Sequence, residues 1–292
     1  MQLRQLEYFQ MVSKMKSMKK TAAFLNVSQP SISVAIKKLE EELGVSLINR
    51  NSKKFQLTKE GSVFLKRANE ILDHVQYSME EMNDYRLDHI ATVKIGITPI
   101  VGAIIFPEIF EKFHTKYPHF KATFIEEGSL VIQELLEKGD IDLGMLILPS
   151  NLVGLEKVTI TIEPIHVCFS NHHPLSRCST VSFDQLKNYP FILFKEDTYS
   201  RQMVLAECEK YQIIPEVVFS SRQVETIIGL VEAGAGISLL PERIVRKHSN
   251  ISSCRLANPI SIEIGLAWNK NRYLSKAGKA FVDFVLQNFH TT

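Results

Sequence analysis

The N-terminal fifth of the chain carries apolar residues at helical spacing and lacks the alternation typical of strands. Polar segments at residues 26–28 and 49–54 divide it into short helices. From Lys59 to about Asp88 the chain contains no Pro, and its only Gly is Gly61, near the start. This stretch is therefore expected to form one long helix.

Beyond residue 91 short apolar runs alternate with amphipathic segments. The expected strands cover residues 93–97, 122–125, 141–147, 165–169, 191–194, 217–219, 237–240 and 262–268. The expected helices cover residues 104–116, 129–138, 183–187, 200–210, 224–233 and 275–288. Strands that alternate with helices of this length indicate parallel sheets with helices on both faces. Two doubly wound α/β lobes fit this count, with a ligand cleft between the lobes or above the strand ends.

Three parts are therefore expected along the chain. They are an all-α domain at residues 1–58, a linker helix at 59–88 and an α/β body at 91–292. Within the body, lobe I is expected to comprise residues 91–162 and 269–292, and lobe II residues 163–268. With 292 residues, 45% of them hydrophobic and 23% charged, the chain has enough apolar material for these cores and is not of disordered composition.

The composition also predicts the cellular compartment of the protein. The longest apolar runs, residues 101–106 and 143–148, are far shorter than the roughly 20 residues that cross a bilayer. The first 25 residues mix charged side chains among the apolar ones and leave no room for the core of a signal peptide. We therefore expect a cytoplasmic protein without a membrane partner, whose four widely spaced cysteines are reduced packing residues.

The charge is unevenly distributed. Residues 1–65 hold 11 Lys and Arg against 5 Asp and Glu, whereas residues 66–90 hold 3 against 6 and the remainder 20 against 21. A compact basic segment attached to a neutral body is typical of a nucleic-acid-binding module. On charge alone, a solvated basic surface is an equally good interpretation.

Residues 18–43 contain the parts of a helix-turn-helix. Ser28 is a natural N-cap for the second helix, and Pro30 lies in its first turn, where a missing amide hydrogen costs nothing. Steps of 4, 3 and 4 residues then place one apolar stripe on the buried face of that helix, made of Ile32, Ile36, Leu39 and Leu43.

The opposite face of this second helix is suited to a DNA major groove. It carries an amide that can pair with adenine, small hydroxyls and a Lys that can contact phosphate, within the set Gln29, Pro30, Ser33, Val34 and Lys37. An ordinary surface helix explains any one of these residues, but it explains the set poorly.

The block from Leu3 to Leu65, above all the run TAAFLNVSQPSISVAIKKLEEELGVSLINRNSKKFQLTKEG, strongly resembles the winged helix-turn-helix of LysR-type transcriptional regulators. The rest of the chain resembles that family in layout, with a linker helix and two α/β lobes like those of periplasmic binding proteins. The resemblance implies that one set of residues faces double-stranded DNA: Ser28, Gln29, Pro30, Ser31, Ser33, Val34 and Lys37. It also implies a wing along the DNA backbone and minor groove, formed by Arg50, Ser52, Lys53 and Lys54. Val34 stands where many relatives carry a polar or basic side chain, so its readout would be a contact with a thymine methyl group.

The long helix carries a heptad pattern. Steps of 4 and 3 residues alternate along Phe64, Ala68, Ile71, Val75, Ser78, Met82 and Tyr85. This stripe either pairs two chains or packs onto its own domain. The family resemblance favours pairing into a dimer or tetramer, which would hold two winged modules on a pseudo-palindromic DNA site.

The α/β body shows no pattern typical of an enzyme. The Gly-rich segment at residues 234–236 lacks the third glycine of a dinucleotide loop because Leu239 stands there, and no Walker loop, nucleophile elbow or zinc-protease motif occurs. His172 and His173 are adjacent but have no partner at metal-ligand spacing. We therefore expect no catalysis, no cofactor and no metal.

A small-molecule effector site is the better prediction for the body. Thr98, Pro99 and Ile100 follow the first strand directly, at the strand end where open α/β sheets bind ligands. Ser129 begins a helix, where it would either bind an anion with the neighbouring amides or act as a plain N-cap. By resemblance, turns in lobe II complete the site with Tyr199, Arg201, Gln223 and Val224, and Lys195 and Arg201 would supply positive charge.

Two stretches, FILFKEDTY and GLAWNKNRYLSKA, are similar to family members that respond to small carboxylates such as acetate or pyruvate. The sequence thus predicts a DNA-binding transcriptional regulator modulated by a small anion. Two alternatives stay open. One is a constitutive DNA-binding protein whose body only oligomerises, and the other is a solute-binding or enzymatic α/β protein with an incidental basic head.

Overall fold

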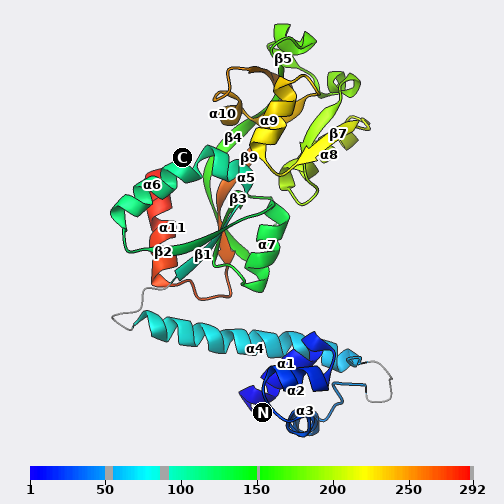
Figure 1. The fold of residues 1–292 in the computed structure, drawn as a ribbon, viewed down its shortest axis with the longest axis vertical. Coiled ribbons are helices and arrows are strands. Elements are labelled where there is room, and N and C mark those ends of the chain that lie inside the picture. Colours follow the sequence, from blue (N-terminus) through cyan, green and yellow to red (C-terminus); the bar gives the residue numbers. More distant parts are fainter. Residues whose placement is uncertain (50–54, 86–91, 150–151, 290–292) are drawn as a thin grey trace. The chain divides into compact units, whose positions relative to one another are not determined.

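A computed structural model describes residues 1–49, 55–85, 92–149 and 152–289 (Figure 1). The chain divides into two compact units, residues 1–85 and 86–292. Each unit has a hydrophobic core of its own. No helix within the described residues is both long and apolar enough to cross a membrane.

The first unit is helical. Its helices are α1 (Leu3–Met15), α2 (Met18–Phe24), α3 (Gln29–Leu43) and α4 (Lys59–Asp84). The Ser17 side chain accepts a hydrogen bond from the Lys20 amide and caps α2, as Ser28 does for α3. An antiparallel bridge between Ile48 and Leu57 forms the stem of the expected wing. The wing residues Arg50, Ser52, Lys53 and Lys54 lie outside the described part of the chain.

Helix α4 is joined closely to this stem at its start. Thr58 caps the helix by accepting a hydrogen bond from the Gly61 amide at 2.8 Å. A Cβ atom at Gly61 would lie 2.0 Å from the Leu47 carbonyl oxygen, so only Gly permits this approach. The expected linker helix is therefore present from Lys59 to Asp84, and its expected end at residue 88 lies outside the described residues.

The second unit contains a large mixed sheet with the strand order β2-β1-β3-β9-β4-β8, and β5 pairs with β9 outside this path. Its strands are β1 (Thr92–Ile97), β2 (Lys121–Glu126), β3 (Leu143–Ile147), β4 (Leu155–Ser170), β5 (Thr180–Val181), β8 (Ser238–Pro241) and β9 (Ile251–Asn269). A two-stranded parallel sheet pairs β6 (Phe191–Phe194) with β7 (Val217–Ser221). Because Phe191 also bridges Ile237 in parallel, this small sheet continues beside β8.

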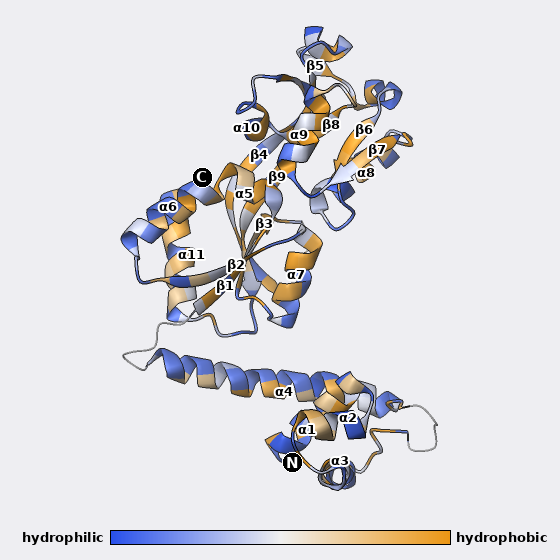
Figure 2. Cartoon of the chain, viewed as in Figure 1, coloured by the Kyte–Doolittle hydropathy of each residue, from blue (hydrophilic) through white to orange (hydrophobic). Residues whose placement is uncertain are grey.

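Helices cover both faces of the sheets. They are α5 (Pro99–Ile104), α6 (Phe106–Lys116), α7 (Ser129–Lys138), α8 (Tyr199–Lys210), α9 (Val224–Glu232), α10 (Glu242–Val245) and α11 (Lys276–Phe289), with short 3-10 helices η1 (Pro174–Arg177) and η2 (Phe183–Asn188). Helix α7 lies on the opposite side of β1 and β3 from α6 and α11 (Figure 1). Figure 2 shows that apolar residues are concentrated in the strands and on the helix faces toward them. This is the expected α/β body with helices on both faces.

Two strands are much longer than the sequence pattern indicates. The expected strands at 165–169 and 262–268 are the ends of β4 and β9, which pair antiparallel along most of their length. The expected strand at 165–169 begins after Pro164, yet Pro164 remains in register with Ser261 between two local register shifts. The large sheet is therefore mixed, and the expectation of parallel sheets is wrong where β9 pairs with β3 and β4 and where β4 pairs with β8.

These long strands join the two lobes. The lobe boundary expected at residues 162 and 163 falls inside β4, and the boundary at 268 and 269 falls at the end of β9. Because β9 pairs with β3 from Ile264 to Ala267, those residues belong structurally with lobe I. A second difference is α5, a short helix directly after Thr98, where the sequence predicts only a turn.

Candidate functional site

The apolar stripe of α3 is confirmed. Ile32, Ile36 and Leu39 are fully buried, and Leu43 packs against the same core. Residues on the other side of the helix are exposed, namely Gln29, Pro30, Ser31, Val34 and Lys37, together with the capping residue Ser28. Ser33 is half-buried at the edge of this face. The set expected to contact DNA thus lies together on one accessible surface.

Hydrogen bonds order the start of this surface. The Ser28 hydroxyl accepts from the Ser31 amide at 3.2 Å, and the two hydroxyl oxygens lie 2.7 Å apart. The Lys37 ammonium lies 3.6 Å from the Glu41 carboxylate, with both side chains largely exposed. Exposed pairs of this kind contribute about 0–1 kcal/mol, so Lys37 can exchange this partner for a phosphate at little cost.

The heptad stripe of α4 splits into two halves. Ala68 is fully buried in the core of its own unit, and Phe64 and Ile71 pack against that core. The Phe64 ring lies 5.8 Å from the Phe9 ring, between ring centroids. The alternative that this stripe packs onto its own domain therefore holds for its first half, and the expectation that Ala68 contacts a second chain is wrong.

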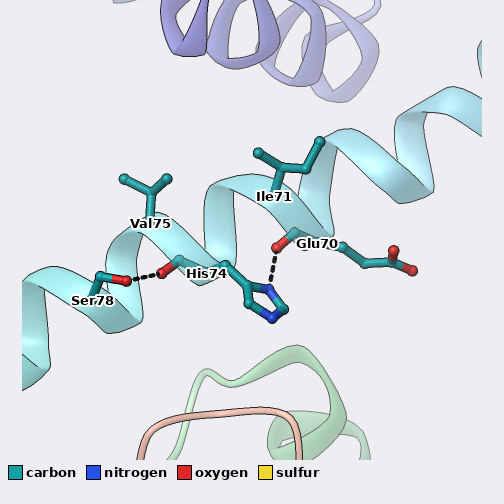
Figure 3. A pocket seen from close by; sticks show the side chains of 5 residues that line it. All are labelled: Glu70, Ile71, His74, Val75 and Ser78. Atoms are coloured by element: carbon teal, nitrogen blue, oxygen red, sulfur yellow. Dashed lines mark hydrogen bonds between the residues drawn. The ribbon is translucent and has the colours of Figure 1, made fainter.

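The second half of the stripe is open to solvent. Met82 is 58% exposed and Tyr85 is 65% exposed. Figure 3 shows the junction of the two halves, where Ile71 and Val75 project from one side of α4 and the His74 ring from the other. The Ser78 hydroxyl donates to the His74 carbonyl oxygen at 2.9 Å, so this polar residue in the stripe is satisfied within the helix.

A small cavity lies between the two lobes of the body. It is bordered in lobe I by Thr98, Pro99, Ile100, Ser129 and Ile147, and in lobe II by Phe194, Thr198 and Ser200. Four of these residues bear hydroxyl groups, two from each lobe, and each is at most 6% exposed. The free volume is about 10 Å³, which is close to the minimum that holds one water molecule.

The hydroxyls of this cavity are unequally satisfied. The Thr98 Oγ1 atom is buried and has no hydrogen-bond partner among the described residues. The Thr198 hydroxyl donates to the Lys195 carbonyl oxygen at 2.7 Å and accepts from the Arg201 amide at 3.4 Å, which caps α8. A buried hydroxyl without a hydrogen-bond partner costs about 1–3 kcal/mol of folding free energy. The Thr98 hydroxyl would therefore gain the most from a hydrogen bond to a ligand.

Two helices begin at this cavity. Ser129 is the first residue of α7, whose N-cap is Gly128, so the interpretation of Ser129 as a plain N-cap is wrong. Thr198 caps α8 and Ser200 lies in its first turn. Each helix N-terminus carries a partial positive charge, so both lobes present the polarity that suits an anion.

The backbone amides at the cavity are less free than the sequence predicts. The Thr98 amide donates to the Met145 carbonyl oxygen at 3.0 Å, and the Leu130 amide donates to the Asp197 carbonyl oxygen at 3.1 Å. The second bond joins lobe I to lobe II, since Leu130 is the second residue of α7 and Asp197 lies just before the N-cap of α8. A ligand at the start of α7 would have to displace or share this contact.

The remaining lobe II predictions are not among the residues that border the cavity. These are Tyr199, Arg201, Gln223 and Val224. The Arg201 guanidinium instead donates to the Phe194 carbonyl oxygen at 3.0 Å and to the Ser220 hydroxyl at 2.7 Å within lobe II. Lys195 is exposed. The expectation that Lys195 or Arg201 brings a positive side chain into the cavity is therefore wrong.

Sequence reasoning missed three residues that border the cavity, Ile147, Phe194 and Thr198, whereas Ser200 lies in the expected turn between Tyr199 and Arg201. A signal existed for Thr198, because a Thr directly before a helix is a typical N-cap. No local pattern identifies Ile147 or Phe194, since they reach the cavity only through the pairing of strands.

A cluster of ion pairs links the two lobes beside the cavity. The Arg222 guanidinium lies 2.7 Å from the Asp197 carboxylate in lobe II and 3.4 Å from the Glu127 carboxylate in lobe I. A Cβ atom at Gly128 would lie 2.4 Å from the Asp197 carbonyl oxygen, so the lobes approach too closely here for any other residue. We call Glu127, Asp197 and Arg222 the interlobe ion cluster.

Groups that would indicate catalysis have structural roles instead. Burial raises the pKa of the Cys168 thiol to about 12 and that of Cys254 to about 11, so neither is a ready nucleophile. Cys178 is exposed, which differs from the expectation that all four cysteines are packing residues. The His173 ring accepts a hydrogen bond from the Leu175 amide and stacks on Phe169 at 5.2 Å. No cluster of potential metal ligands occurs in the part of the chain that the structure describes.

Comparisons with known proteins agree with this architecture. Residues 3–62 match the bacterial regulatory helix-turn-helix of the lysR family, and residues 89–290 match the LysR substrate binding domain. The uncharacterized HTH-type transcriptional regulator YwbI of Bacillus subtilis (strain 168) is 35% identical over 286 residues, covering 97% of this chain and 95% of that protein. The transcriptional dual regulator GltC of the same organism is 31% identical over 297 residues, covering 99% and 98%.

Solved structures show the same arrangement of elements. HinK, a LysR family transcriptional regulator from Pseudomonas aeruginosa, has a TM-score of 0.58 and 27% identity, with 99% of this chain and 98% of that chain covered. Full-length CbnR, solved with its target DNA, has a TM-score of 0.61 at 23% identity and covers 98% of this chain and 99% of that chain, so it shares the fold.

An N-terminal helix-turn-helix joined to an effector-binding α/β body defines a class of DNA-binding transcriptional regulators. The chain belongs to the LysR family of these regulators. Members of this family bind DNA and small-molecule effectors and form oligomers. The family and the relatives are transcriptional regulators and not enzymes, which removes the enzymatic alternative.

Proposed function

We propose that this regulator binds a small anion, a carboxylate, in the cavity between its lobes and that this binding alters how the paired winged modules engage DNA. The observation that carries the proposal is the cavity itself. Four buried hydroxyls converge on it from both lobes, and one of them, on Thr98, lacks a partner.

An anion fits this site better than a neutral or cationic ligand. The starts of α7 and α8 both lie at the cavity, and each contributes about 0.3–1 kcal/mol, or more when partly buried, toward a negative charge. Hydroxyl groups can donate hydrogen bonds to carboxylate oxygens. None of the described residues that border the cavity is acidic. A carboxylate therefore gains hydrogen bonds here, and the Arg222 guanidinium offsets one of the two carboxylate charges of the interlobe ion cluster beside the cavity.

The cavity must open to admit such a ligand. Its free volume of about 10 Å³ accommodates one water molecule, whereas even acetate has four non-hydrogen atoms. The interlobe ion cluster and the bond between Leu130 and Asp197 favour the closed arrangement. Effector binding would shift the population toward a different spacing of the lobes. This shift is the means by which we propose that the effector acts.

On the DNA side, we propose that Gln29 and Ser33 read bases in the major groove while Lys37 contacts phosphate. The exposed face of α3 supports this assignment, because these side chains lie on it beside Ser28, Pro30, Ser31 and Val34. We propose that two chains pair through the second half of the α4 stripe, with the half-buried Val75 and the exposed Met82 and Tyr85. The wing residues complete the interface by family resemblance alone.

The effector proposal is tested by calorimetric titration of the full-length protein with acetate, pyruvate and other small carboxylates. Loss of a hydrogen bond to a charged ligand costs about 1.5–3 kcal/mol, so Ser129→Ala should weaken binding at least tenfold. Thr123→Ala is the matched control, since Thr123 is exposed on β2 and does not border the cavity. Equal affinity in the Ser129 variant, or binding of neutral compounds alone, would contradict the proposal.

A further inference from the structure

Glu40 occupies a position in α3 where a carboxylate is unfavourable. It lies in the last turn of the helix, where Glu41 and Glu42 follow it and no basic residue is present. The C-terminus of a helix carries a partial negative charge, so carboxylates close to it are destabilising. A negative charge beside a DNA-binding surface is also repelled by phosphate. A compensating interaction is therefore expected for Glu40.

The Glu40 carboxylate accepts hydrogen bonds from two backbone amides beyond the end of α3. Its Oε1 atom accepts from the Leu47 amide at 2.8 Å and from the Ile48 amide at 3.1 Å. The Glu40 carbonyl oxygen accepts from the Gly44 amide, which caps the helix, and from the Val45 amide at 3.2 Å. Hydrogen bonds to a charged acceptor are roughly twice as strong as those between neutral groups. Glu40 thus directs the path of the chain from α3 to Ile48.

The two amides that the carboxylate binds belong to the base of the expected wing. Ile48 bridges Leu57, and the Leu47 carbonyl oxygen accepts a hydrogen bond from the Thr58 amide at 3.0 Å. We call Leu47, Ile48, Leu57 and Thr58 the wing stem. Residues 50–54, which include the expected wing residues, lie between its two sides along the chain. The direction of the wing stem therefore decides where the wing leaves the module.

Water cannot take the place of the Glu40 carboxylate in the wing stem. Leu47 is fully buried and Ile48 is 5% exposed. Without the carboxylate, their amides would be buried without this acceptor, which disfavours the observed path of the chain. The start of α4 depends on the same segment, because Gly61 lies against the Leu47 carbonyl oxygen. Glu40 therefore links α3 to both the wing stem and the linker helix.

We propose that Glu40 is a positioning residue for DNA binding, which holds the wing stem in a fixed direction relative to the exposed face of α3. This inference rests on the proposed binding of DNA through that face, and it adds the residue that aligns the wing with it. Without Glu40 the stem would sample several directions, and DNA would have to select one of them at a cost in affinity. The reach of the acceptor oxygen should matter, and the charge should not.

The test compares Glu40→Asp with Glu40→Gln in the full-length protein. Asp keeps the charge but is one methylene too short to reach both amides, whereas Gln loses the charge and keeps an acceptor oxygen at the same reach. Fluorescence anisotropy at several salt concentrations measures binding to an operator selected from random DNA and to unrelated DNA.

Glu40→Asp should weaken binding to both DNAs by roughly fivefold or more, because two hydrogen bonds to a charged acceptor are impaired. It should also reduce the slope of log K against log salt concentration by about 0.9 per lost phosphate contact. Glu40→Gln should bind both DNAs within about twofold of the unmodified protein, since a neutral acceptor still serves both amides.

Glu42→Asp is the matched control. Glu42 is exposed in the same turn and contacts the N-terminal amine, so this variant carries the same loss of helix propensity without touching the wing stem. It should bind DNA as the unmodified protein does. Thermal unfolding establishes that each variant is folded.

Three results would overturn the proposal. They are unchanged DNA binding by Glu40→Asp, equal losses in Glu40→Asp and Glu40→Gln, and loss of operator preference in Glu40→Asp, which would mean that Glu40 supports α3 itself. Failure of base reading by α3 would appear elsewhere, because Gln29→Ala would then lose equally on both DNAs while the contrast between the two Glu40 variants persisted.

Discussion

Thr98 has the most informative single side chain of the body. Its hydroxyl is buried without a partner at the start of α5, where it borders the cavity between the lobes. Thr98→Val replaces the hydroxyl by a methyl group of similar shape, so the ligand-free protein should become more stable by about 1 kcal/mol. The same change should weaken carboxylate binding at least tenfold. Thermal unfolding and calorimetric titration measure the two effects, and a variant that loses stability would contradict this role.

Gln29 and Lys37 should have different effects on DNA binding. Both lie on the exposed face of α3. Gln29→Ala should cost about 1–3 kcal/mol on an operator selected from random DNA and far less on unrelated DNA, because a base contact is lost. Lys37→Ala should weaken binding to the operator and to unrelated DNA alike. It should also reduce the slope of log K against log salt concentration by about 0.9 per lost phosphate contact. Fluorescence anisotropy at several salt concentrations separates them, and equal losses for Gln29→Ala on both DNAs would show that α3 does not read sequence.

At the residue scale, sequence periodicity predicts the α3 surface because the helix itself sets which residues face outward. It does not predict where the Arg201 side chain points, because the guanidinium is held by the Phe194 carbonyl oxygen and the Ser220 hydroxyl of other elements. The sequence does predict that Thr98 and Ser129 border the cavity. Thr98 directly follows a recognisable strand, and Ser129 begins a recognisable helix. Ile147 and Phe194 are not predicted, since only strand pairing brings them to the cavity.

At the scale of elements, α4 serves two purposes along its length. Its first half packs in the core of its own unit through Ala68, whereas Met82 near its end is exposed. A charge at Ile71 would therefore disturb the winged module itself and would not isolate dimerisation. The periodicity of this helix predicts the stripe but cannot show which half its own domain covers.

Met82→Asp tests the pairing of α4. It should weaken self-association, because a charge in an apolar seam loses hydration without gaining a partner. Gln76→Asp, at an exposed position of the same helix outside the stripe, is the matched control and should leave the association state unchanged. Analytical ultracentrifugation of the full-length variants measures this. Dimers of undiminished affinity in Met82→Asp would mean that the chains pair elsewhere.

Strand lengths are likewise only partly predictable from the sequence pattern. The pattern locates β1, β6 and α7 within a residue or two, since each is bounded by turn residues. It misses about two-thirds of β4 and of β9, because their Pro and polar positions lie within long antiparallel partners that keep the pairing intact. The pairing of the complete sheet determines which strands continue from one lobe into the other, and no local pattern shows it.

At the scale of the whole molecule, the interlobe ion cluster should influence effector affinity. Arg222 contacts both Asp197 and Glu127. These groups are partly exposed, so their net contribution is at most about 1 kcal/mol. Arg222→Ala should therefore favour more open lobes and raise carboxylate affinity by no more than about fivefold. Arg243→Ala removes a pair made with Glu163 away from the cavity and is the control in the same titration. Weaker binding by Arg222→Ala would contradict this prediction and would mean that the Arg222 charge or the closed arrangement holds the ligand.

We expect a small anion bound between the lobes to change DNA binding by the winged modules. The most direct measurement is a DNase footprint of the full-length protein on its selected operator, titrated with a panel of small carboxylates. At least one carboxylate should alter the extent or affinity of the footprint, and Thr98→Val should require at least tenfold more of that carboxylate. A footprint that no carboxylate changes would contradict the proposal of a carboxylate effector.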